Sequence, residues 1–339
     1  MIPFIDMHCD TISVMLNNAR TGNDIELRKN NLQVDLERLI SGGCMCQSFA
    51  LFANQALCKE LNLTPFEYAL NLSDTFDREI EKNSDIIRPA YSGTDIEKNF
   101  ADGYVSALKT IEEGAVYDGK AGNLKKFYAM GVRKSTITWN YENELAYPNH
   151  SVTDKKTGEY HCVGVDTENG LKPAGFEMIK AMEELGIIID VSHLNDAGIY
   201  DILKTVKPST PIIASHSNCR ALRFHPRNLT DDMLRKIAEH GGVAGITFCD
   251  AFLSDDQKET RLSRISDIVS HISYMKQIGG IDMIGIGTDF DGTLSVQEVN
   301  GSGEMQKLAD AMSIAGFTTD EIEKVFYKNV LRVYKEVLG

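Results

Sequence analysis

Along this chain, amphipathic helical stretches that end in glycine alternate with short apolar runs. The stretch ERLISGG leads into CMCQSFALF, IKAMEELG leads into IIIDVSH, and the same order recurs three more times. Glycine is typical of a helix C-terminus, where a left-handed residue satisfies the last carbonyl groups. The apolar runs lack clean alternation, which indicates strands that are buried on both faces of a parallel sheet.

Three further runs, PFIDMH, SALKTIEEG and PIIASHS, bring the expected strands to about eight. Eight strand–helix units in 339 residues predict a (β/α)8 TIM barrel. A doubly wound open sheet is the alternative, because periodicity alone does not separate the two architectures. We expect residues 1–339 to form a single domain, with an inserted loop at about 141–170 after the fourth strand. Such a loop either covers a site or is simply solvated. Apolar residues at helical spacing predict a final packing helix over 318–338.

Composition limits the classes of partner. The chain has 35 Lys and Arg against 49 Asp and Glu, a formal charge of −14, which argues against nucleic acid. No apolar run approaches the ~20 residues of a membrane helix, and the start MIPFIDMHCD does not read as a secretory signal. Seven cysteines without a paired CxxC motif indicate reduced thiols. We therefore expect a cytoplasmic protein without a nucleic-acid or membrane partner.

Polar side chains stand where the predicted strands end. From the first strand to the last they are His8, Asp10, Glu112, His193, His216 and Asp289. In a barrel these ends converge on one face, where active sites are built. Each residue taken alone is more simply a strand cap, a core histidine or a loop charge. Together, however, imidazoles and carboxylates that face one cavity are costly to bury without a cation, and this ligand set suits zinc.

These motifs, in order from DMHCDT to GIGTDFDG, resemble the membrane (renal) dipeptidase family, the M19 metallopeptidases of the amidohydrolase superfamily. The resemblance runs nearly from end to end of the chain. It implies a (β/α)8 barrel with two Zn2+ ions per chain at the C-terminal face of the strands, and the activity of a metallo-dipeptidase.

Carried over residue by residue, the resemblance assigns roles. The implied metal ligands are His8, Asp10, Glu112, His193 and His216. Glu112 of IEEG, rather than its neighbour Glu113, falls at the glutamate that bridges the two ions. Asp289, the first acidic residue of TDFDG, falls at the catalytic aspartate. Arg227 of HPRN falls at the arginine that holds the substrate carboxylate.

One segment departs from the family pattern. Members such as the renal enzyme carry a histidine after the fourth strand that helps to polarise the scissile carbonyl. In this chain the segment reads TITWN, and Trp139 stands at that position. We expect Trp139 and Asn140 to contact substrate. Asn140, Asn143 or a zinc ion are the alternatives for the missing electrophile.

The resulting hypothesis is hydrolysis of dipeptides, including those with a C-terminal D-residue, by attack of a metal-bridging hydroxide. Asp289 would carry the proton, and Arg227 would favour short substrates with a free C-terminus. The alternatives are a related amidohydrolase that acts on N-acyl amino acids or lactams, and a non-catalytic metal-binding homologue. A nucleotide-binding protein is disfavoured, because neither GxGxxG after a strand nor a P-loop occurs. Dimers are common in the family, so the resemblance points to a homodimer.

Overall fold

The structure is a computed structural model that describes residues 1–153, 160–255 and 260–339. In this part of the chain, eight parallel strands follow one another in the order β2-β1-β12-β10-β9-β8-β5-β4, and β4 pairs with β2 to close the ring. The barrel strands are β1 (Phe4–Cys9), β2 (Cys44–Phe52), β4 (Val105–Glu112), β5 (Val132–Thr136), β8 (Ile188–Asp190), β9 (Ile213–Ala214), β10 (Val243–Ile246) and β12 (Ile284–Ile286). They coincide with the eight expected runs, so the barrel is confirmed and the open sheet is excluded.

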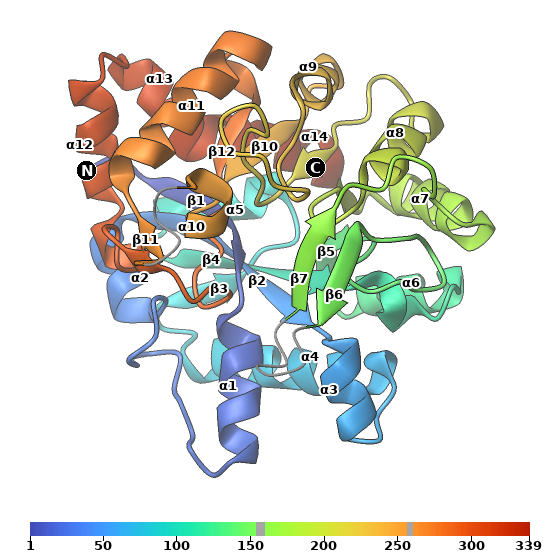
Figure 1. The fold of residues 1–339 in the computed structure, drawn as a ribbon. Coiled ribbons are helices and arrows are strands. Elements are labelled where there is room, and N and C mark those ends of the chain that lie inside the picture. Colours follow the sequence, from blue (N-terminus) through green and yellow to red (C-terminus); the bar gives the residue numbers. More distant parts are fainter. Residues whose placement is uncertain (154–159, 256–259) are drawn as a thin grey trace.

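Helices form a layer around the strands (Figure 1). They are α1 (Thr11–Arg20), α2 (Leu36–Gly42), α3 (Gln55–Glu60), α4 (Pro65–Lys82), α5 (Gly93–Ala101), α6 (Ala121–Ala129), α7 (Pro173–Leu185), α8 (Asp196–Thr205), α9 (Asp231–Glu239), α10 (Asp250–Leu253), α11 (Ile265–Gly279), α12 (Gln306–Ile314), α13 (Thr319–Glu323) and α14 (Asn329–Leu338). Gly43 and Gly186, which follow α2 and α7, have φ values of 80° and 68°. The expected left-handed glycines therefore end these two helices.

The amino-terminal end of the barrel is closed by the last helix. Val330 and Tyr334 of α14 pack with Ile5 of β1 in an apolar cluster inside the strands. The expected packing helix over 318–338 is thus confirmed, although Lys324–Lys328 form a π-helical turn within it. Because this end is filled, the opposite end, at the carboxyl termini of the strands, is the one left to form a site.

Several short strands lie outside the barrel ring. They are β3 (Ile87–Pro89), which pairs with β4, and the pairs β6 (His150–Thr153) with β7 (Tyr160–Gly164) and β11 (Leu262–Ser263) with β13 (Val296–Gln297). The antiparallel pair β6–β7 belongs to the segment expected as an inserted loop (Figure 1). An isolated bridge between Pro148 and Leu194 ties this segment to the residues that follow β8. The described part of this segment is therefore joined to the barrel beside the end of β8.

Buried carboxylates fix the strand ends that carry the histidines. Asp6 accepts a hydrogen bond from the backbone N–H of His8 at 3.3 Å. Oδ1 of Asp190 accepts from the backbone N–H groups of Ser192 at 3.0 Å and Ser215 at 2.9 Å. Each of these serines directly precedes one of the expected histidine ligands in the sequence.

Lys134 provides the counter-charge for Asp190. Nζ of Lys134 lies 3.6 Å from Oδ2 of Asp190 and also donates to the carbonyl of Met7. The side chains of this pair are 1% and 0% exposed. Burial opposes ionisation of Asp190, but Lys134 and the serine N–H groups bring its pKa below the ordinary value. The carboxylate that orders two histidine-bearing segments therefore depends on one buried cation.

Lys134→Met should destabilise the fold by about 3–5 kcal/mol, because it leaves Asp190 as a buried charge without its cation. The free energy of unfolding in urea measures this effect. Lys109→Met is the matched control: Lys109 is also buried, but its partner Asp77 is 58% exposed and can be solvated by water. An equal loss of stability in the two variants would contradict this account.

Candidate active site

The first strand brings two expected ligands to the open end of the barrel. His8 lies in β1 and Asp10 follows it, so both side chains reach the same side of the site. Nε2 of His8 is 3.3 Å from Oδ2 of Asp10, and both residues are buried. The backbone N–H of Asp10 donates to the carbonyl of Phe290 at 3.0 Å. This bond ties the end of β1 to the segment that follows β12.

Glu112, the last residue of β4, reaches two histidines from different parts of the chain. Its Oε2 is 3.1 Å from Nε2 of His8, and its Oε1 is 2.9 Å from Nε2 of His193. The neighbouring Glu113 has a φ of 83°, and its Oε1 accepts a hydrogen bond from Nδ2 of Asn143 at 2.6 Å. Glu112, and not Glu113, is therefore the carboxylate that lies between the two sides of the cluster.

His193 and His216 come from neighbouring strand ends. They follow β8 and β9, and their Nε2 atoms lie 2.9 Å apart. His193 has a φ of 72°, in the left-handed region. For a residue other than glycine this conformation costs about 1–3 kcal/mol, and it persists where the surrounding structure holds a functional side chain in place.

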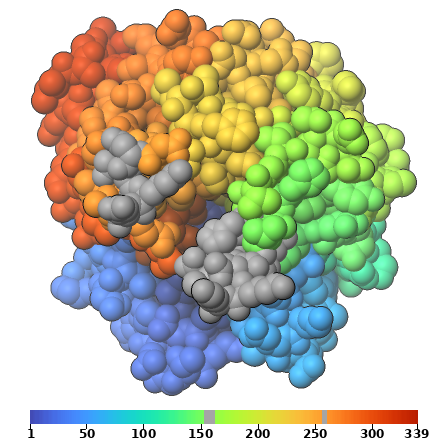
Figure 2. Space-filling model, viewed as in Figure 1, coloured from blue at the N-terminus to red at the C-terminus, as the bar shows by residue number. Residues whose placement is uncertain are grey.

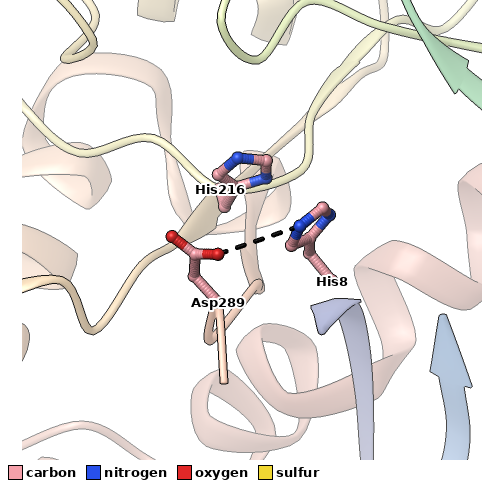
Figure 3. Close-up of side chains that lie close together, drawn as sticks. All are labelled: His8, His216 and Asp289. Carbon is pink, nitrogen blue, oxygen red and sulfur yellow. Dashed lines mark ion pairs between the residues drawn. The ribbon is translucent and has the colours of Figure 1, made fainter. Parts of the chain in front are cut away.

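Asp289 follows β12 and points toward His8 and His216 (Figure 3). Its Oδ1 is 3.8 Å from Nε2 of His8, and its φ of 62° is also left-handed. Burial is the main reason that the pKa of Asp289 is raised to about 8, and the nearby carboxylate of Asp10 adds to the shift. At Gly292 a Cβ would lie 2.2 Å from Oδ2 of Asp10 and 2.5 Å from Oδ1 of Asp289. Only glycine there lets both carboxylates keep their places.

The ligand atoms form three overlapping groups, and within each group all ligand atoms lie within 4.8 Å of one another. Two of the groups share Glu112: one consists of His8, Asp10 and Glu112, and the other of Glu112, His193 and His216. The third consists of His8, His216 and Asp289. Oδ1 of Asp10 is buried and, within the part of the chain that the structure describes, has no hydrogen-bond partner. Burying so many such groups without a compensating charge is costly, so these residues fit divalent cations.

Local electrostatics also favour positive charge at this place. Burial opposes ionisation of Glu112, but His8 and His193 hold its pKa far below the usual range. Burial likewise opposes protonation of His8, yet Glu112 and Asp10 raise its pKa well above the ordinary value. Burial lowers the pKa of His193 to about 4 and that of His216 well below its usual range. These two imidazoles are therefore neutral, the form that binds a metal ion.

Outer hydrogen bonds orient the same two rings. Nδ1 of His193 is 3.0 Å from Oδ1 of Asn140, an atom that can only accept. The ring therefore donates from Nδ1, which leaves the lone pair of Nε2 free to bind a metal. Oγ of Ser215 lies 2.8 Å from Nδ1 of His216. Asn140, which was expected to contact substrate, lines the pocket and at the same time positions His193.

The cluster opens into a pocket of about 500 Å³. N-terminal (blue), central (green) and C-terminal (orange) segments meet on the face of the molecule seen in Figure 2. Arg227 lies in the pocket wall and is buried, with its Cζ 5.5 Å from the centre of the Phe252 ring. Its Nε and Nη2 atoms have no hydrogen-bond partner among the described residues. The guanidinium group can therefore receive an anionic group of a ligand.

Some pocket residues were not expected from the sequence. They are Phe52, Cys162, His225, Cys249 and Phe252. Phe52 ends β2, so the convergence of strand ends could have indicated it. Nδ1 of His225 accepts the backbone N–H of Arg227 at 3.2 Å, and burial lowers the pKa of His225 to about 3. This ring is therefore neutral and orders the backbone that carries the arginine.

Trp139 lines the pocket beside His193, with ring centroids 5.8 Å apart. Asn143, considered above as a substitute electrophile, donates from Nδ2 to Glu113 at 2.6 Å and to the carbonyl of Ile137 at 2.9 Å. These bonds engage its amide group in holding the loop that follows β5. Asn143 therefore holds the loop that carries Trp139 and does not itself line the pocket.

A closed eight-stranded barrel with a histidine–carboxylate cluster at the carboxyl ends of its strands defines a metal-dependent hydrolase. The model of the membrane dipeptidase family, peptidase family M19, matches residues 1–338. The chain belongs to this family and is a metallo-dipeptidase, as the resemblance implied.

Two individual relatives are similar to this chain in sequence. An uncharacterised protein in the pqqA 5′ region of Klebsiella pneumoniae is 34% identical over 251 residues, which cover 74% of this chain and 89% of that protein. Dipeptidase tcpJ of Claviceps purpurea (strain 20.1) is 27% identical over 311 residues, which cover 90% of this chain and 69% of that protein.

A solved structure shows the same fold. The metallo peptidase from Rhodobacter sphaeroides, liganded with a phosphinate mimic of the dipeptide L-Ala-D-Ala, superposes with a TM-score of 0.88 at 22% identity. The superposition covers 99% of both chains.

Of the helices that the structure describes in our protein, none is long and apolar enough to cross a membrane.

Asn140→Ala should weaken divalent-metal affinity by about 10–100-fold, because His193 loses the acceptor that orients its ring. Metal content after equilibration with a competing chelator measures this change. Asn140→Asp keeps an acceptor oxygen in place and should retain affinity within about threefold of the unmodified protein. Unchanged affinity in Asn140→Ala would show that this hydrogen bond does not support the site.

Proposed function

We propose that this protein is a zinc-dependent dipeptidase with two metal ions per chain. His8, Asp10 and Glu112 would hold one ion, and Glu112, His193 and His216 the other. The observation that carries the proposal is the pair of ligand groups that share Glu112. Mixed imidazole and carboxylate ligands are typical of catalytic zinc. We also propose that residues 1–339 act as one catalytic domain, with 141–170 as an insertion at the site.

Two divalent ions bound there would lower the pKa of a bound water and polarise the scissile carbonyl. The residues of the chain supply the rest of the chemistry. Asp289 borders the cluster through its Oδ1 and faces the pocket. Divalent cations beside it would favour its ionised form, in which it is placed to take a proton from the attacking water and return it to the leaving amine. Its left-handed backbone fixes this placement.

Arg227 would select for substrate length. Its buried guanidinium offers Nε and Nη2, which match the two oxygens of a carboxylate in a bidentate fork. Arg227 and the metal cluster line the same pocket, so a free C-terminal carboxylate at this arginine with the scissile carbonyl at the cluster would favour short substrates such as dipeptides. The phosphinate ligand of the Rhodobacter sphaeroides relative leads us to include C-terminal D-residues among the substrates.

The direct test is hydrolysis by metal-free protein with zinc added back. We expect no turnover of L-Ala-L-Ala or L-Ala-D-Ala without metal, and activity that rises to a plateau near two equivalents of zinc.

Asp289→Asn should bind the same amount of zinc and lose most of its turnover, by about 100-fold or more, since it removes the proton carrier. Zinc binding without hydrolysis in the unmodified protein would favour a non-catalytic homologue. Turnover of N-acyl amino acids or lactams in place of dipeptides would favour the related amidohydrolase.

Arg227→Lys should lower kcat/KM for dipeptides by about 10–100-fold, mainly through KM, because lysine cannot form the bidentate fork. The matching dipeptide amides, which lack the carboxylate, should change by less than about threefold. Steady-state kinetics on each pair of substrates measures the difference. If acids and amides lost the same factor, Arg227 would not recognise the carboxylate.

A further inference from the structure

Two aromatic side chains line the pocket next to the metal cluster. We call Phe52 and Trp139 the aromatic wall; both face the pocket, and their ring centroids lie 5.0 Å apart. Tyr141 supports Trp139 at 5.1 Å. Across the sheet, Phe52 is paired with Glu112, so the wall stands directly beside the proposed bridging carboxylate. An apolar surface thus begins where the metal ligands end.

Of the wall, Phe52 lies across the barrel from the strand that precedes Arg227, whereas Trp139 follows β5, two strands from β9. Phe52 ends β2, and Arg227 lies in the segment that follows β9. In the closed order of strands, β2 and β9 are four steps apart in either direction, which makes them diametrically opposite. The metal cluster lies between these two sides. A ligand anchored at Arg227 that passes over the cluster therefore arrives at the aromatic wall.

Buried hydrogen bonds hold the wall in place. Oε2 of Glu113 accepts the backbone N–H of Trp139 at 3.2 Å. Oε1 of the same carboxylate accepts from Asn143, which also donates to the carbonyl two residues before Trp139. The backbone N–H of Phe52 donates to Oγ of Ser13 at 3.2 Å. A surface fixed before ligand arrives loses little entropy on binding, which strengthens its selectivity.

We infer that the aromatic wall is the subsite for the side chain of the N-terminal residue of the dipeptide, and that it selects large apolar side chains. This inference rests on the proposed function. With the C-terminal carboxylate at Arg227 and the scissile carbonyl at the cluster, the N-terminal residue extends toward Phe52 and Trp139. Rings of this size gain from burying leucine or phenylalanine and gain little from glycine or alanine.

The test compares dipeptides that differ in one position: Ala-Ala, Leu-Ala and Ala-Leu. In the zinc-loaded unmodified protein, kcat/KM for Leu-Ala should exceed that for Ala-Ala by about 10-fold or more, as expected for an apolar subsite. Phe52→Ala should remove most of this preference, so that the ratio of kcat/KM for Leu-Ala to that for Ala-Ala falls toward one, whatever the change in the absolute rates. Phe100→Ala, a change at an exposed phenylalanine of α5, is the matched control and should leave all three rates unchanged.

Binding can be followed without turnover, because Trp139 is the only tryptophan of the chain. In the Asp289→Asn background, Leu-Ala should change the tryptophan fluorescence and bind about 10-fold more tightly than Ala-Ala. Phe52→Leu, which keeps apolar bulk without the ring, should retain part of this difference. It also serves as a second variant if Phe52→Ala is poorly folded.

The outcomes separate this inference from the proposed function. If Ala-Ala and Leu-Ala are hydrolysed equally well, or if Phe52→Ala lowers both by the same factor, the dipeptidase function stands and the subsite is refuted. A preference for Lys-Ala over Leu-Ala would also refute it, since the wall would then recognise a cation. If none of the dipeptides is hydrolysed with zinc loaded, the proposed function itself fails, and the inference fails with it.

Discussion

The organisation of this site follows from the cost of placing Glu112 in a buried position between histidines that come from three different strand ends. A carboxylate with 3% exposure is tolerated only when positive charge and hydrogen-bond donors surround it. In this fold the histidines around Glu112 are held by further buried groups. Buried carboxylates such as Asp190 order the histidine-bearing segments, and Lys134 neutralises that carboxylate in turn. The strained backbone at His193 and Asp289 is maintained because the packed barrel around it admits few alternatives.

Barrel topology explains why so much of the site was predictable. The helix–glycine–strand pattern located five barrel strands and three further apolar runs located the others, and a closed ring brings their carboxyl ends to one face whatever the details of packing. Polar residues at those ends, such as His8, Glu112 and His216, therefore lie close together in any closed barrel of parallel strands. The structure places Glu112 3.1 Å from His8 and 3.8 Å from His216, although each of these histidines is more than 100 residues away from it in the sequence.

Features that depend on side-chain direction were not predictable in the same way. Phe52 closes the apolar run FALF: its place at a strand end could have indicated it, but an apolar residue there also reads as one more core residue, and the register of β2 against β4 pairs it with Glu112. The role of Asn140 depends on the ring orientation of His193, which the sequence does not encode locally. The β6–β7 pair arises in a polar segment without the alternating pattern that identifies strands, so only a loop was expected there.

The position of Trp139 after a barrel strand could be predicted from the sequence, but the direction of its side chain could not. Imidazole can accept, donate or carry a proton, whereas indole can only donate and mainly contributes apolar surface. Where the resemblance implies a polarising histidine, Trp139 would therefore supply the recognition surface that we propose. Such an exchange is tolerable only where other groups act on the scissile carbonyl, and here Trp139 stands directly beside His193 of the proposed metal site. Because Phe52 contacts the indole ring and Glu113 accepts the backbone N–H of Trp139, we explain the tryptophan as part of the proposed apolar subsite and not as the loss of a catalytic residue.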